Sequence, residues 1–352
     1  MDDRAFLILR RWPHHATHSG YDILARHVGT PLSADPIPKW LLPDRLLWRL
    51  ARGVIPYDRT AVALELLGAR HMLTHRDAVY HFLYAESSYK YLGLLNGKRG
   101  HHLLATFHVP PGGFVEIIQT SEHIKRLSGA IILGRNQYAM LDHALPPERI
   151  WFVPYAVDTE YFRPLDKHDA PTGVPNAPTT REESTVLFVG HHLRDFQVLR
   201  AVIEQAGLVA PQLKFVVVTL PYCFSHFANL KGNFELYSGL PEAELLRLYQ
   251  QAILMALPLT DAVANTAVLE AMACGLPMVI TDVGAVRDYV DESHALLVPK
   301  GEPGAMLDAI LQLYAARDAR ERMGKSARQR ALLFDWHIIA DQVRRIYQSL
   351  RG

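Results

Sequence analysis

The chain contains 352 residues, with 37 lysines and arginines against 36 aspartates and glutamates, and its formal net charge is +1. Nothing in this balance suggests a nucleic-acid-binding protein, which would show a concentrated basic excess. Hydrophobic residues make up 49% of the chain and charged residues 21%, as in a globular protein with ample core, and the length favours two domains.

Signals for export, membrane insertion and metal binding are weak. The N-terminus lacks the basic start and long apolar segment of a signal peptide, and no run approaches the roughly 20 apolar residues of a transmembrane helix. The two cysteines do not form a disulfide framework, so a cytoplasmic setting is expected. Among the 18 histidines, His71 and His75 have helical spacing but lack the acidic neighbour of a zinc protease, so no metal site is predicted.

The first half of the chain shows short apolar runs separated by polar segments. The runs predict strands at residues 5–9, 78–83, 103–107, 130–133 and 150–153. Ser19 and Gly20 lie in the loop after the first of them, before a helix that we expect to begin at Tyr21. A glycine at such a strand-to-helix turn lets a ligand approach the backbone closely. His108 follows the third strand, where parallel sheets bind their ligands.

Residues 39–52 combine bulky apolar side chains with Lys39, Arg45, Arg49 and Arg52. From Asp44 onward the pattern predicts a short amphipathic helix. An interfacial membrane helix has this composition. A helix that packs on the protein core has it too and is the more ordinary case, so both interpretations stay open.

A linker is predicted at residues 166–184, which are rich in proline, threonine, asparagine and charge and lack apolar periodicity. We therefore expect an N-terminal domain at residues 1–165 and a second domain at residues 185–333. Further strands are predicted at residues 185–190, 213–220, 234–236, 253–257, 278–281 and 296–299. Helices are predicted at residues 195–205, 242–252, 266–273, 303–316 and 318–334, and residues 334–352 contain a final amphipathic helix. This alternation of strands and helices indicates two doubly wound α/β domains.

The first strand of the second domain ends at Gly190 and is followed by His191, His192 and Arg194. Arg194 is the cation near this turn that keeps its charge at all relevant pH values. It lies at the start of a helix, where the helix dipole disfavours a positive charge. This misfit favours a functional role over that of an ordinary surface arginine.

Residues 261–282 predict a loop, a helix, a tight stop and a strand. Asn265 is a suitable N-cap, whose side-chain oxygen we expect to accept from an amide of the first turn. Thr266 begins the helix, and Gly275 supplies its left-handed stop. The free amides of such a helix end attract phosphate. Glu270, one turn in, is suited to accept hydrogen bonds from sugar hydroxyls, although an ordinary glutamate on a surface helix would give the same sequence.

The segment from Asn265 to Gly284 strongly resembles the donor-site signature of the retaining glycosyltransferases of family 4. This resemblance implies the GT-B fold, with two facing Rossmann-like domains and a C-terminal helix that crosses back to the first domain. It implies that Glu270 holds the ribose of the nucleotide. It also implies that His108, in a Thr-x-His element, faces the donor sugar, and that the Gly20 loop lies on the acceptor or phosphate side.

The sequence departs from the family pattern at three positions. The family usually has a second glutamate where this chain has Ala262, so either the adjacent Asp261 substitutes for it or the sugar is held differently. The family also places arginine directly after the glycine of the turn and lysine five positions later, where this chain has His191 and Phe196. We assign neutralisation of the diphosphate to Arg194, with His191 or His192 assisting.

The sequence therefore predicts a metal-independent retaining glycosyltransferase that moves a sugar from a nucleoside-diphosphate sugar to a glycan, lipid or small-molecule acceptor, with no other cofactor. The predicted catalytic residues are His108 and Arg194. The predicted donor-binding residues are Gly20, Gly190, His191, His192, Asp261, Asn265, Thr266 and Glu270. Three alternatives remain: a nucleotide-sugar epimerase, a sugar phosphorylase and a non-catalytic nucleotide-binding partner subunit. The expected location is the cytoplasm, and residues 39–52 leave open a peripheral position at the inner membrane face.

Overall fold

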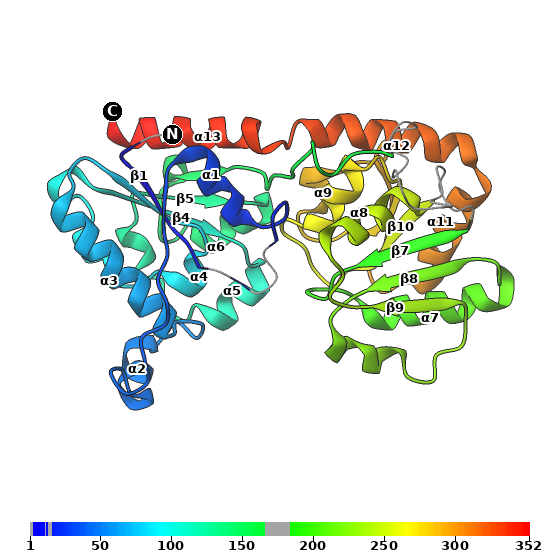
Figure 1. Ribbon diagram of the computed structural model, residues 1–352, viewed down its shortest axis with the longest axis horizontal. Helices are drawn as coiled ribbons and strands as arrows, with labels where there is room; N and C mark the ends of the chain where they lie inside the picture. The colour runs from blue at the N-terminus through cyan, green and yellow to red at the C-terminus, as the bar shows by residue number, and fades with distance from the viewer. Residues whose placement is uncertain (1–2, 11, 13–15, 166–183) are drawn as a thin grey trace. The chain divides into compact units, whose positions relative to one another are not determined.

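The computed structural model describes residues 3–10, 12, 16–165 and 184–352. The chain divides into two compact units (Figure 1): one comprises Met1–Tyr155 with Trp336–Gly352, and the other comprises Ala156–Asp335. The predicted linker at residues 166–184 lies, except for Ser184, outside the described residues.

The N-terminal unit is built on a parallel sheet of six strands in the order β2-β1-β3-β4-β5-β6. Most strand residues are buried apolar side chains, as expected of a sheet covered on both faces. The order places the change of winding direction between β1 and β3. The strands are β1 (Ala5–Ile8), β2 (Thr30–Leu32), β3 (Val79–Phe82), β4 (His102–Phe107), β5 (Gly129–Ile132) and β6 (Ile150–Phe152).

The prediction did not include strand β2 or the helices α3 to α6 of the N-terminal unit. Strand β2 is a short edge strand with Pro31 at its centre and little burial, so it has no apolar run to reveal it. The 16-residue helix α3 is capped by Asp58, whose side chain accepts from the amide of Ala61 at 3.0 Å. The helices of this unit are α1 (Leu24–Val28), α2 (Asp44–Ala51), α3 (Arg59–Thr74), α4 (Ala85–Ser88), α5 (Pro111–Ile117), α6 (Tyr138–Leu141) and α13 (Trp336–Arg351).

The C-terminal helix α13 packs within the N-terminal unit, as predicted, against α1 and β3. Its buried face contains Ile339, Val343, Ile346 and Tyr347. The Tyr347 hydroxyl lies 2.8 Å from Nδ1 of His81 on β3, and both side chains are buried. Burial lowers the pKa of His81 to about 3, so this contact joins two neutral groups at pH 7.

Helix α2 differs from an ordinary core-packing helix. None of its residues is buried, and only its last turn, through Leu50 and Ala51, packs partly against the core. Trp40 and Trp48 are 81% and 72% exposed. The core-packing interpretation of residues 39–52 therefore holds for the buried Leu42 and for the last turn of α2, and not for the exposed side chains between them.

The C-terminal unit is a second six-stranded parallel sheet, in the order β12-β11-β10-β7-β8-β9. Figure 1 shows α7 on one face and α8 and α9 on the other. The winding direction changes between β7 and β10, and open α/β sheets bind ligands at the carboxyl ends of strands at such a point. Its elements are β7 (Thr185–Val189), α7 (Phe196–Val209), β8 (Lys214–Val218), β9 (Phe234–Tyr237), α8 (Glu242–Gln251), β10 (Leu254–Leu257), α9 (Thr266–Ala273), β11 (Met278–Thr281), α10 (Val286–Tyr289), β12 (Ala295–Val298), α11 (Pro303–Ala315) and α12 (Arg317–Leu332). The prediction of two Rossmann-like α/β units is confirmed.

Candidate functional site

Two loops meet at the change of winding direction in the C-terminal unit. One follows β7 and the other follows β10, and backbone hydrogen bonds join them: the amide of Asp195 donates to Pro258 O and that of Thr260 to Leu193 O, each at 3.0 Å. Leu193 has a φ of 57°, a left-handed conformation that costs a non-glycine residue roughly 1–2 kcal/mol. Strain of this kind is frequent at functional sites, where the surrounding structure enforces it.

The side chain of Arg194 folds back over the end of β7. Its Nε donates to Val189 O at 3.0 Å, Nη1 donates to His192 O at 2.9 Å, and Nη2 donates to Asn265 Oδ1 at 3.2 Å. Gly190 has a φ of 104°, and a Cβ atom at this position would lie 2.5 Å from Nη2. The glycine is therefore needed for the guanidinium to lie against the backbone at the end of the strand.

Arg194 brings a positive charge to the N-terminus of α9, which is itself a positive helix end. Burial lowers the pKa of Arg194 to about 10, against the opposing influence of Tyr249 and Glu270, so the group stays charged at pH 7. A guanidinium beside a helix N-terminus is unfavourable unless an anion joins them. An anion at this position could accept charge-assisted hydrogen bonds from the guanidinium and from helix amides.

Helix α9 spans Thr266–Ala273 and strand β11 spans Met278–Thr281, both as predicted. Asn265 is the N-cap residue, but its side chain does not cap the helix, which corrects the prediction. Its Oδ1 accepts from Arg194 instead. The first turn, beginning at the half-exposed Thr266, is thus left without a side-chain cap, as at helix ends that bind phosphate.

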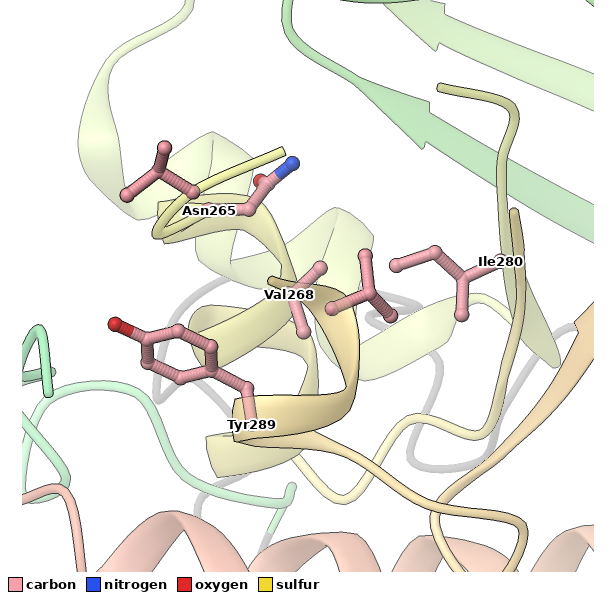
Figure 2. Close-up of a pocket in the computed structure, with 6 residues that line it drawn as sticks. Asn265, Val268, Ile280 and Tyr289 are labelled. Atoms are coloured by element: carbon pink, nitrogen blue, oxygen red, sulfur yellow. The ribbon is translucent and has the colours of Figure 1, made fainter. Parts of the chain in front are cut away.

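A small pocket lies beside this helix start (Figure 2). It is lined by Val263, Asn265, Val268, Ile280, Val286 and Tyr289. Most of this lining is aliphatic, and it includes neither lysine nor arginine. The positively charged side chain at the helix start, Arg194, therefore lies outside the lining of this pocket.

Glu270 is buried, with 5% of its surface exposed, so the interpretation as a surface glutamate is wrong. Its Oε2 accepts a hydrogen bond of 2.7 Å from the hydroxyl of Tyr249, which lies in the last turn of α8. Burial, and then the charge of Glu270, raises the pKa of Tyr249 well above its ordinary value, so the phenol remains a donor. Tyr249 was not among the predicted site residues.

Asp261, His191 and His192 lie in the two loops that follow β10 and β7. Asp261 is half-buried, and its Oδ1 accepts from the amide of Ala262 at 2.7 Å. His191 is half-buried and its ring centroid lies 6.1 Å from that of Tyr222. Partial desolvation lowers the pKa of His192 and the charge of Arg194 lowers it further, which favours a neutral ring at pH 7.

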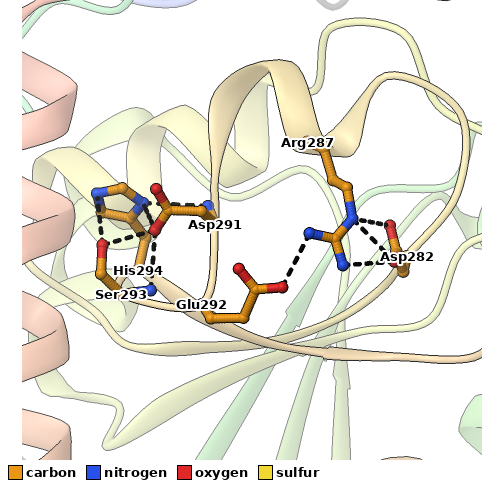
Figure 3. Close-up of polar contacts among 6 residues, drawn as sticks. All are labelled: Asp282, Arg287, Asp291, Glu292, Ser293 and His294. Atoms are coloured by element: carbon orange, nitrogen blue, oxygen red, sulfur yellow. Dashed lines mark hydrogen bonds and ion pairs between the residues drawn. The ribbon is translucent and has the colours of Figure 1, made fainter.

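A second arginine of this unit has a different environment (Figure 3). Arg287 donates from Nε to both carboxylate oxygens of Asp282 at 3.0 Å, and its Nη1 lies 2.8 Å from Glu292. Hydrogen bonds to these two acids raise the pKa of Arg287. Its charge is balanced within the protein, so Arg287 is a weaker candidate than Arg194 for contact with a diphosphate.

Gly20 and His108 belong to the N-terminal unit. Gly20 has a φ of 134°, in the region that favours glycine, and the amide of the next residue, Tyr21, donates to the Tyr84 hydroxyl at 3.3 Å. Nε2 of His108 donates to Leu83 O at 2.7 Å. The His108 ring stacks on Tyr84, with centroids 4.4 Å apart, and meets Tyr21 edge-on at 4.8 Å. Gly20 and His108 are thus linked through two tyrosines that the prediction did not include.

The structure adds two findings that concern metals and membranes. Within the described ranges, no three His, Cys, Asp or Glu side chains are grouped so that they could hold a metal ion. No helix of those ranges combines the length and apolar character needed to cross a membrane.

Comparison with known proteins gives matches over much of the chain. Residues 183–316 match the family model described as glycosyl transferases group 1. A D-inositol 3-phosphate glycosyltransferase of Segniliparus rotundus is 30% identical over 224 residues, which are 60% of this chain and 49% of the relative. The enzyme of the same name from Mycobacterium marinum is 28% identical over 227 residues, with 60% and 47% covered. The chain thus spans about half the length of these two curated relatives.

Solved structures show the same fold at low sequence identity. Anabaena HepE in complex with UDP has a TM-score of 0.70 at 14% identity and covers 99% of this chain and 100% of that chain. The sucrose-phosphate synthase of Thermosynechococcus elongatus has a TM-score of 0.66 at 20% identity, with 92% and 83% covered. Residues 183–316 are therefore similar to group 1 glycosyl transferases, and the two Rossmann-like units have the GT-B fold.

Proposed function

We propose that this chain is a retaining glycosyltransferase that transfers a sugar from a nucleoside-diphosphate sugar to a hydroxyl acceptor. The observation that carries the proposal is the pair Arg194 and Glu270 at the start of α9. A charged, half-buried guanidinium meets the N-terminus of the helix, and a buried carboxylate lies one turn further along. The pair lies at the carboxyl ends of strands where the winding changes, within the residues that match group 1 glycosyl transferases.

Each group has a defined task in this proposal. Arg194 and the amides at the start of α9, where Thr266 lies, bind the diphosphate and stabilise the charge that develops as the bond from the sugar C1 to the diphosphate oxygen breaks. His191, His192 and Gly190 contribute backbone or side-chain contacts around it, and Asp261 is a candidate sugar contact. Glu270 accepts from the ribose hydroxyls. In the N-terminal unit, Gly20 and His108 keep the roles that the family resemblance implies.

The chemical step needs no catalytic carboxylate pair in this proposal. The acceptor oxygen forms the new bond to C1, and the proton of the acceptor passes to the departing phosphate oxygen. The diphosphate leaves with the electron pair of the broken bond, and the new bond lies on the face that the diphosphate occupied. No metal ion is assigned a role, because the guanidinium and the helix end supply the positive charge.

The donor and acceptor are chosen for testing from the comparisons. Solved neighbours contain UDP and UDP-glucose, and the curated relatives include D-inositol 3-phosphate glycosyltransferases and a phosphatidyl-myo-inositol mannosyltransferase of Mycobacterium leprae. We therefore propose an acceptor that carries an inositol-like polyol, either free and phosphorylated or in a lipid headgroup.

The test is a panel of UDP-, GDP- and ADP-sugars in a thermal-shift assay. A ligand at a hundred times its dissociation constant should stabilise the fold by roughly 2.7 kcal/mol. The stabilising donor is then incubated with D-inositol 3-phosphate or with phosphatidylinositol vesicles, and the anomeric configuration of the product is read by NMR. Conversion of the donor sugar without an acceptor would indicate an epimerase. Formation of sugar phosphate from inorganic phosphate would indicate a phosphorylase, and nucleotide binding without turnover would indicate a partner subunit. Any of these outcomes contradicts the proposal.

We further propose that residues 39–52 make a peripheral contact with an anionic membrane. The segment has four basic residues against the single acid Asp44, and its two tryptophans are exposed. Its end is anchored to the N-terminal unit, because the buried Lys90 donates to Arg52 O at 2.7 Å and also to Leu50 O. Its start is anchored as well, because Leu42 is buried and Arg59 donates from Nε to Leu42 O at 2.9 Å. A basic-apolar segment that is held in place and exposes two tryptophans is suited to insert them among lipid headgroups.

We expect the protein to float with vesicles that contain anionic lipid and to lose this association in high salt. Each basic residue near such a surface contributes about 1 kcal/mol, and salt screens the attraction. Replacing Trp40 and Trp48 together by serine should reduce the bound fraction about tenfold, because the apolar contact is lost. Leu208→Ser is the matched control, since Leu208 is 85% exposed on α7 of the other unit. A protein that stays soluble with every lipid composition, or a control with the same loss, would contradict this proposal.

A further inference from the structure

We infer that Tyr249 is a positioning residue for nucleotide recognition: its hydroxyl holds the carboxylate of Glu270 in the orientation that accepts from the ribose. The inference rests on the function proposed above. Tyr249 lies on α8 and Glu270 lies on α9, and the hydroxyl of the first donates to Oε2 of the second at 2.7 Å. Tyr249 has none of its surface exposed and Glu270 has 5%.

Burial makes this hydrogen bond consequential. A buried carboxylate that loses a hydrogen bond is destabilised, because water cannot reach it to replace the lost donor. Glutamate has three rotatable side-chain bonds, so the carboxylate would have more freedom of orientation without the Tyr249 donor. The Tyr249 ring is itself fixed, because it packs edge-on against Phe162 with centroids 6.2 Å apart and planes at 86°. A rigid donor therefore sets the orientation of a flexible acceptor.

The direction of the hydrogen bond is also fixed. The raised pKa of Tyr249 keeps the phenol protonated throughout the neutral range, so it donates and the carboxylate accepts. Arg194 is close enough for both Tyr249 and Glu270 to influence its pKa. Tyr249 thus interacts electrostatically with Arg194, the proposed diphosphate contact, as well as with Glu270, the proposed ribose contact. A ribose held through Glu270 would depend on a residue that touches no part of the nucleotide.

The competing explanation is that Tyr249 only ties α8 to α9. Tyr249→Phe separates the two roles, because phenylalanine keeps the ring and its packing and removes only the hydroxyl. The ligands are UDP, GDP and ADP, together with the 2′,3′-dideoxy analogue of whichever of them binds. A positioning role requires that the effect of the substitution depend on the ribose hydroxyls, whereas a structural tie would affect both ligands alike.

The experiment is isothermal titration calorimetry on the full chain. We expect Tyr249→Phe to weaken binding of the ribose form about tenfold, and to change binding of the dideoxy analogue less than about twofold. In a Glu270→Gln background the same substitution should have little further effect on the ribose form. Tyr89→Phe is the matched control, since Tyr89 is also buried and its hydroxyl donates to His123 O at 2.7 Å in the N-terminal unit. This control should bind like the wild type.

The outcomes distinguish this inference from the function on which it rests. If the wild type binds none of the three nucleotides, the proposed function fails and the inference fails with it. If Glu270→Gln weakens binding and Tyr249→Phe does not, Tyr249 has no positioning role and the proposed function stands. Two results would assign Tyr249 a purely structural role. The first is an equal loss of affinity for the ribose and dideoxy ligands. The second is a Tyr249→Phe variant that is partly unfolded and whose melting temperature does not change when nucleotide is added.

Discussion

Replacement of Arg194 by alanine is expected to lower kcat about a hundred- to a thousand-fold, as when one preorganised donor to a developing charge is removed. The departing diphosphate gains charge as the bond to C1 breaks. The N-terminus of α9 alone contributes about 0.3–1 kcal/mol at an exposed site, which is too little to replace a guanidinium. His192 is a poor substitute, because its pKa is lowered by desolvation and by Arg194 itself. Steady-state rates with saturating donor measure the effect.

The contacts of Arg194 make the choice of controls important. The guanidinium bonds to two carbonyl groups and to Asn265, so its removal also loosens the loop after β7. Arg194→Lys restores a charge but not the planar fork, and should recover only part of the rate. Arg287→Ala removes an arginine of the same unit whose charge is balanced by acids, and should leave turnover near the wild-type value.

Two results would contradict the assignment of Arg194. The first is near-normal turnover of Arg194→Ala at saturating donor, in which case His191 and His192 become the next candidates. The second is an equal loss of rate in Arg194→Ala and Arg287→Ala, which would point to general destabilisation of the unit. Melting temperatures of both variants separate this case from a specific loss.

The sequence predicted most of the sheet framework because parallel strands that are buried on both faces are short apolar runs. The segment from α9 to β11 was predicted to the residue, since a capping position, a glycine with a φ of 63° and a following proline delimit it. Helix α3 was missed although Asp58 caps it and Ala61, Leu64, Gly68 and Met72 form a buried stripe. Apolar residues between these positions, among them Val62, Leu66 and Ala69, obscure the helical period, because they add aliphatic side chains outside the buried stripe.

The details of the site depend on contacts that no local pattern encodes. Arg194 can reach Asn265, 71 positions later, because Leu193 adopts a left-handed conformation and Gly190 lacks a side chain. Because Asn265 Oδ1 accepts from Arg194, it does not accept from an amide of the first helical turn, and the expected N-cap hydrogen bond does not form. Tyr249 meets Glu270 across two helices separated by a strand and a loop. Each contact requires the sheet to bring distant loops together, so sequence spacing could suggest the participants but not their pairing.

Glu270→Gln is expected to weaken donor binding about ten- to a hundredfold while changing kcat far less. A hydrogen bond to a charged group contributes about 1.5–3 kcal/mol, and the glutamine amide replaces a charged acceptor by a neutral one. The ribose does not react, so its contacts are the same in the ground state and the transition state and mainly set KM. The contrast with Arg194, whose loss should lower kcat, tests whether the two residues divide binding from catalysis.

The choice of glutamine follows from the burial of Glu270. Glu270→Ala would remove the acceptor of the buried Tyr249 hydroxyl, and an unsatisfied buried group costs about 1–3 kcal/mol. Glutamine keeps an oxygen that can accept from Tyr249. Glu244→Gln, at an exposed position on α8, is the matched control and should bind the donor like the wild type. Donor affinity in Glu270→Gln that equals that of this control would remove Glu270 from the nucleotide site and leave its carboxylate with the structural task of joining α8 to α9.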